Sequence, residues 1–114
     1  MMWINVHGKG FAIDEGVLGY IERRLRFALG RFGDLIGRVT VLVDADGHRA
    51  EHEKLCRVVV DLLGHARIVV EDTDSSLNAA IDRAADRVGQ AVHRKLDRVR
   101  LYAALNGPRP AGWN

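Results

Sequence analysis

Residues 69–98, VVEDTDSSLNAAIDRAADRVGQAVHRKLDR, join the end of one strand to the longest helical pattern in the chain. From here apolar residues recur at spacings of three and four, which is typical of an amphipathic helix. The positions are Leu77, Ile81, Ala84, Ala85, Val88, Val92, Leu96 and Val99. We expect Thr73 or Asp74 to cap this helix and the helix to run to about Tyr102.

Besides this helix, the sequence predicts a second helix and four strands. Alternation is clearest in residues 36–44, where Val39, Val41 and Val43 occupy every second position. The other predicted strands are 2–7, 55–63 and 65–71, with a tight turn at Gly64 between the last two. The second helix is expected to start at an Asp14 cap and to run to about Phe32.

The predicted order β-α-β-β-β-α defines an α+β fold. Three consecutive strands with short connections favour an antiparallel meander. Two amphipathic helices are expected to cover one face of the four-stranded sheet, which gives a two-layer sandwich. The chain has 114 residues, which suits one domain. We expect that domain to span residues 1–103 and residues 104–114 to form a flexible tail.

Overall composition narrows the class of protein. Seventeen basic residues against 15 acidic ones leave a net charge of +2, which excludes a polybasic or histone-like protein. The single cysteine, Cys56, cannot form an intrachain disulfide. The N-terminus has no signal-peptide pattern, and no apolar run approaches the ~18 residues of a membrane span. A cytoplasmic protein that does not bind membranes is therefore expected.

Charges on the long helix are sorted by side. On a helical wheel Arg83, Arg87, Arg94 and Arg98 lie on one flank, and Asp82, Asp86 and Asp97 lie on the other. Like charges four residues apart cost a few tenths of a kcal/mol in a free helix. A surface that alternated positive and negative residues would avoid that cost. The row of arginines therefore favours an anionic partner over a role in solubility alone.

The first helix repeats this pattern more weakly. Arg24 and Arg31 lie seven residues apart with Tyr20 and Phe27 on the same general side. Arginine beside aromatic rings suits nucleic acid, because the guanidinium meets phosphate and a ring can stack on a base.

Other cations have weaker signals. Arg23 and Arg26 point away from that side of the first helix and are expected to be mainly solvated. Lys9, in the turn Gly8-Lys9-Gly10, could contact phosphate, although the segment is too short to cradle one by itself.

Candidate metal or catalytic groups are few. His48, His52 and Cys56 have a spacing that could bind zinc in a helix, but a solvated loop leading to a buried thiol is favoured. The acidic run 71–74 could suggest Mg²⁺, but capping of the following helix explains it better. Asp82 could act as a base, but a solvated flank is the favoured interpretation. No nucleophile, base and orienting group come together, so we expect no catalytic residue, no metal and no cofactor.

Over roughly residues 2–100 the sequence resembles a known family. Residues 69–98 resemble the second-helix region of the ribosome hibernation promoting factors and ribosome-associated inhibitors, also described as sigma-54 modulation proteins. The most specific part is the AAID-x-A-x-DR pattern at residues 79–87. The segment YIERRLRFALGRFGDLIGRVTVLV, residues 20–43, resembles the family's first helix and second strand. DADG followed by KLCRVVVDL matches the rest of the order.

The resemblance implies a fold similar to double-stranded-RNA-binding domains and a role at the ribosome. Such proteins bind the small ribosomal subunit between head and body, where they overlap the sites of messenger and transfer RNA. Ribosomal RNA would be the partner, with no small-molecule substrate. The family's basic positions correspond here to Arg23 or Arg24 in the first helix and to Arg83, Arg87, Arg94 and Arg98 in the second, with Lys95 as an addition.

Two departures and two alternatives accompany this resemblance. Asn78 stands where the family often has an aromatic residue, and Gln90 stands near a frequently basic position. The chain resembles the short form of the family, without the C-terminal domain that pairs ribosomes. A general double-stranded-RNA-binding module is one alternative function, and a small metal-dependent enzyme built around His48 and His52 is the other.

Overall fold

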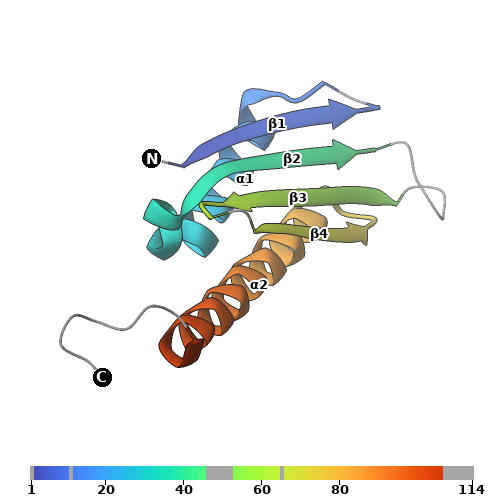
Figure 1. The fold of residues 1–114 in the computed structure, drawn as a ribbon. Helices are drawn as coiled ribbons and strands as arrows, with labels where there is room; N and C mark the ends of the chain where they lie inside the picture. The colour runs from blue at the N-terminus through green and yellow to red at the C-terminus, as the bar shows by residue number, and fades with distance from the viewer. Residues whose placement is uncertain (1, 11, 46–52, 65, 107–114) are drawn as a thin grey trace.

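Four strands lie side by side in the order β1-β2-β3-β4, and two helices pack on one face of the sheet (Figure 1). The computed structural model describes residues 2–10, 12–45, 53–64 and 66–106. In chain order the elements are β1 (Trp3–Lys9), α1 (Glu15–Leu29), the 3-10 helix η1 (Gly30–Leu35), β2 (Ile36–Asp44), β3 (Lys54–Leu62), β4 (Arg67–Asp74) and α2 (Leu77–Asn106). The predicted α+β order is confirmed.

Strand directions make this a mixed sheet. β2, β3 and β4 form the expected antiparallel meander. β1 pairs in parallel with β2, with Trp3 opposite Arg38 and Val6 opposite Val41. A parallel pair requires a crossover connection, and α1 supplies it. The sequence pattern alone did not predict that β1 and β2 would be neighbours.

A single layer of apolar side chains joins the sheet to the helices. Val39, Val41 and Val43 of β2 are fully buried, as their alternation predicts. The helices cover them with Ile21 and Leu25 of α1 and with the apolar stripe of α2. The opposite face of the sheet has no helix over it among the residues that the structure describes. The C-terminal part of α2 extends past the strands (Figure 1).

Element ends differ from the sequence-based expectation in both helices and in two strands, since β1 runs to Lys9 and β4 to Asp74. The α-helical turns of α1 stop at Leu29, and the chain tightens into η1, which still buries Phe32. α2 begins at Leu77 and ends at Asn106 rather than near Tyr102. Its first turn is capped by the hydroxyl of Ser76, so the prediction of a cap at Thr73 or Asp74 was wrong.

Caps and turns explain these ends. The Asp14 carboxylate accepts the backbone N–H of Val17 at 2.8 Å, which confirms the predicted cap of α1. Asp74 instead accepts the N–H of Ser76 at 2.8 Å and so stabilises the turn before α2. Gly64 has a φ of +96°, a left-handed conformation that glycine adopts without strain, in the turn that joins β3 to β4.

The two helices approach each other closely at one point. Gly89 of α2 packs on Ala28 of α1, and a Cβ atom added to Gly89 would lie 3.0 Å from the Ala28 carbonyl oxygen. Absence of a side chain at Gly89 therefore sets the distance between the helices. Neither of these helices has an apolar stretch long enough to cross a membrane.

Candidate nucleic-acid interface

The first two arginines of the long helix, Arg83 and Arg87, are bound to the end of β4. Arg83 donates to the carbonyl oxygen of Thr73 at 2.5 Å and to the carboxylate of Asp74 at 2.7 Å. Arg87 donates to the carbonyl oxygen of Glu71 at 2.6 Å. Because β4 is an edge strand, these arginines satisfy backbone acceptors that another strand could otherwise pair with.

Asp72 lies between the same two arginines. One of its carboxylate oxygens is 3.3 Å from Arg83 Nε, and the other is 3.2 Å from Arg87 Nη1. The acidic run 71–74 therefore neutralises part of the predicted basic row. A helical wheel counts only the charges of its own helix, so it could not show that β4 brings carboxylates to this flank.

Asp74 in this run is also held in its charged form. The N–H of Ser76 lowers the pKa of the Asp74 carboxyl, and the positive charge of Arg83 acts in the same direction. The sequence favoured capping of the following helix over Mg²⁺ for this run, but Asp74 stabilises the turn before α2 and Ser76 caps the helix.

Arg94, Lys95 and Arg98, about two to four turns further along α2, are in a different situation. Arg94 and Arg98 are exposed, and Lys95 is half-buried. Within the described ranges, none of the three forms an ion pair with a carboxylate. The nearest acid on this stretch, Asp97, is 3.2 Å from His93 Nε2. These cations are therefore available to an external anion.

Tyr20 and Arg24 of α1 contact the acidic flank of α2. The Tyr20 hydroxyl donates to Asp82 Oδ1 at 2.5 Å, and Arg24 Nε donates to the same oxygen at 2.9 Å. Arg24 Nη2 also donates to Asp86 at 3.0 Å. Asp82 is thus an acceptor between the helices, and the prediction that it lies on a merely solvated flank was wrong.

Ionisation of this cluster follows from its contacts. The hydrogen bond to Asp82 raises the pKa of Tyr20, because loss of the hydroxyl proton would place two negative charges together. Burial acts to lower the pKa of Arg24, but the hydrogen bonds to Asp82 and Asp86 outweigh it and raise that pKa. Tyr20 and Arg24 therefore hold the two helices together before any partner binds.

Other predicted contact residues lie apart from one another. Arg31 is exposed, with its guanidinium carbon 4.6 Å from the centre of the Phe32 ring. Arg23 borders a shallow hollow of about 310 Å³ together with Asn78. Lys9 follows the alternation of Trp3 on β1, which places it on the sheet face opposite the helices.

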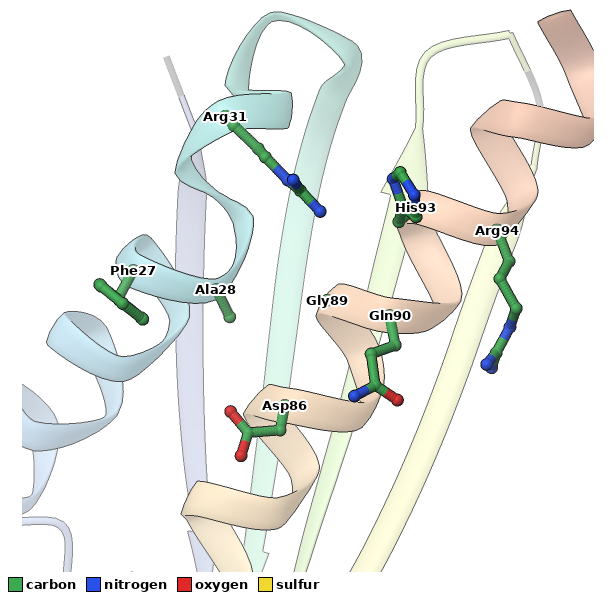
Figure 2. Close-up of a pocket in the computed structure, with 8 residues that line it drawn as sticks. All are labelled: Phe27, Ala28, Arg31, Asp86, Gly89, Gln90, His93 and Arg94. Atoms are coloured by element: carbon green, nitrogen blue, oxygen red, sulfur yellow. The ribbon is translucent and has the colours of Figure 1, made fainter.

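A groove between α1 and α2 brings several of these groups together (Figure 2). Its volume is about 500 Å³, within the range of small-ligand sites. Arg31 extends from one wall toward His93, while Phe27 and Arg94 lie on opposite sides. The lining residues are Phe27, Ala28, Arg31, Asp86, Gly89, Gln90, His93 and Arg94.

Five lining residues were not predicted as part of a site: Ala28, Asp86, Gly89, Gln90 and His93. All of these except Ala28 come from α2. A helical wheel places His93 on the same flank as Asp82, so its position beside the acidic residues could have been predicted from helical periodicity. The close contact of Gly89 with Ala28 had no sequence signal, since it depends on how the helices cross.

The structure gives little support to a metal site at His48, His52 and Cys56. His48 and His52 lie outside the described residues. Cys56 is free and buried, as the sequence favoured, and burial raises the pKa of its thiol to about 12. A thiolate, the form that binds zinc, is therefore disfavoured at this position. The part of the chain that is described contains no group of three or more metal-ligating side chains.

Comparison with solved structures gives two similar folds. The chain is 28% identical to the N-terminal domain of Protein Y from Thermus thermophilus, with a TM-score of 0.67, and the match covers 82% of this chain and 97% of that one. A ribosomal subunit interface protein from Coxiella burnetii is 16% identical, with a TM-score of 0.70, and the match covers 85% and 99% of the two chains. The second likeness concerns the fold alone.

Comparison at the level of sequence identifies the family. A search of curated proteins found no match. The profile of the family described as "Sigma 54 modulation protein / S30EA ribosomal protein" matches residues 4–100, which include every strand and both helices up to the last turns of α2. This chain therefore belongs to the sigma 54 modulation protein / S30EA ribosomal protein family.

Proposed function

We propose that this protein binds the small ribosomal subunit and blocks the sites of messenger and transfer RNA, so that idle ribosomes stay inactive. Family membership and the Protein Y fold support a ribosome-associated modulation or hibernation factor. Contacts to ribosomal RNA phosphates by arginine would hold it there. It would act in the cytoplasm by steric occlusion, without a cofactor or a small-molecule substrate.

One observation carries the choice of surface. Arg31 and Arg94 line the groove between the helices, and Lys95 and Arg98 follow Arg94 along α2. None of these four cations has a carboxylate partner in the described part of the chain. Arginine presents a planar set of donors that matches phosphate. Arg24, Arg83 and Arg87 already bind acceptors inside the protein, so their role is mainly to shape this surface.

The family also decides the question of catalysis. It is not a family of enzymes, which removes support from the alternative of a metal-dependent enzyme around His48 and His52. Other expectations from the resemblance remain proposals, including the small subunit as partner and Lys9 and Arg23 as peripheral contacts.

Sedimentation with purified subunits tests the proposal with a matched pair of variants. Arg94→Glu and Arg38→Glu each reverse one exposed charge, but Arg38 lies on the opposite face of the sheet. We expect Arg94→Glu to lose sedimentation with small subunits at moderate salt, while Arg38→Glu behaves as the parent. Equal binding by both variants would exclude the helix face as the contact surface.

A bare RNA duplex in the same experiment distinguishes the general RNA-binding alternative. A ribosome factor should bind small subunits much more tightly than the duplex at the same salt concentration. Similar affinity for both would favour a general double-stranded-RNA-binding module. Thermal unfolding of each variant controls for loss of structure.

A further inference from the structure

The groove between α1 and α2 contains more than a set of phosphate contacts. Phe27 is 84% exposed on its rim, which is unusual for a phenylalanine in a domain with an ample core. Packing does not account for this ring, because other side chains of α1, such as Ile21 and Leu25, pack in the core. An exposed ring in the same groove as Arg31 and Arg94 offers a surface on which a base can stack.

Two arginines lie at this groove without a carboxylate partner among the described residues. Arg31 comes from η1 and Arg94 from α2, and Figure 2 shows them on the two helical walls. Neither forms an ion pair with a carboxylate in the ranges that the structure describes. Arg24, by contrast, forms an ion pair with Asp86 at 3.0 Å and so adds no free positive charge to the groove.

The groove is shallow, and its lining is more apolar than polar. Gly89 and Ala28 form a floor without large side chains, which leaves the volume of about 500 Å³. Gln90 offers both a donor and an acceptor, and Asp86 Oδ1 already accepts Arg24. Such groups can pair with the edge of any base by rotation of the Gln90 amide, so the groove should tolerate different bases.

We infer that this groove binds one unpaired nucleotide of an RNA strand, with its base against Phe27 and its flanking phosphates at Arg31 and Arg94. The inference rests on the proposed function and names the form of RNA that the site takes. A paired base cannot present its face to Phe27, because its neighbours in the helix cover it. Single-stranded RNA is therefore preferred over duplex at this groove.

Fluorescence anisotropy with a labelled oligouridylate strand and a fully paired RNA duplex of equal length tests the inference. Phe27→Ala should weaken binding of the single strand about tenfold, since stacking on one aromatic ring has that order of effect. Its affinity for the duplex should stay unchanged. Phe27→Tyr keeps a ring and should restore binding of the single strand.

Trp3→Ala is the matched control, because Trp3 is also a largely exposed aromatic residue but lies on the other face of the sheet. It should leave both affinities unchanged. An equal loss for single strand and duplex with Phe27→Ala would overturn the inference, and so would an equal loss with Trp3→Ala. Thermal unfolding checks that each variant is folded.

Failure of this inference can be told apart from failure of the proposed function. If only the inference is wrong, Phe27→Ala leaves oligouridylate binding intact while the parent protein still sediments with small subunits. If only the proposed function is wrong, the parent protein does not bind subunits, yet Phe27→Ala still weakens binding of the single strand.

Discussion

The salt dependence of ribosome binding should separate the two halves of the arginine row. Each phosphate contact contributes about 0.7–0.9 to the slope of log affinity against log salt. Contacts by Arg31, Arg94, Lys95 and Arg98 therefore predict a slope of about −3 for the parent protein. A fourfold rise in salt should then weaken binding about 60-fold.

Paired neutral substitutions give the comparison. Arg94→Gln with Arg98→Gln removes two unpaired cations, which should halve the slope and reduce the same salt effect to about eightfold. Arg83→Gln with Arg87→Gln removes two cations that bind β4. Its slope should stay near that of the parent, while its melting temperature falls because carbonyl groups at the edge of the sheet lose their donors.

Filter binding or sedimentation across a salt series measures these slopes, and calorimetry measures the melting temperatures. The assignment of roles would be refuted if the Arg83 and Arg87 pair lowered the slope as much as the Arg94 and Arg98 pair. It would also be refuted if the Arg94 and Arg98 pair left the slope at its parental value.

Three further predictions concern the packing and titration of the domain. Gly89→Leu should lower the free energy of unfolding by about 1–3 kcal/mol in urea titrations, because a side chain there overlaps the Ala28 carbonyl; unchanged stability would contradict the close contact. Cys56, with a pKa raised to about 12, should react with a thiol reagent at mildly alkaline pH far more slowly in the native than in the unfolded protein, and equal rates would show an accessible thiol. The pKa of Asp74 is lowered on folding from 3.8, so its stabilisation is complete above that value and is lost as the pH falls through the folded pKa. Asp74→Asn should therefore lose less melting temperature on acidification than the parent, and identical acid profiles would speak against this linkage.

Sequence patterns predicted correctly those features that depend on a single helix or strand. Alternation placed Val39, Val41 and Val43 in the core, and spacing placed the apolar stripe of α2 against the sheet. Asp14 could be predicted as a cap because its hydrogen bond to Val17 is local. These features depend only on the periods of strand and helix, which the sequence contains.

Contacts between distant segments could not be predicted in the same way. Arg24 and Asp82 are 58 positions apart, and only the crossing of the helices brings them to 2.9 Å. A helical wheel predicts that Arg83 and Arg87 are available to an external anion. In the structure, however, β4 places Asp72 beside both of them. Thus the charge pattern correctly indicated a basic helix but could not divide it into internally paired and free arginines.

The parallel pairing of β1 with β2 also constrains the order in which the domain assembles. Trp3 of β1 pairs with Arg38 of β2, which is 35 residues later in the chain. Strands β3 and β4, by contrast, are joined by a short turn, and their partners Asp61 and Arg67 are only six residues apart. Pairing between distant segments carries a larger loop-closure cost and tends to form late. We therefore expect β1, although it is synthesised first, to join the sheet last during folding. Its backbone amides should be the first strand amides to exchange with solvent when the native domain opens.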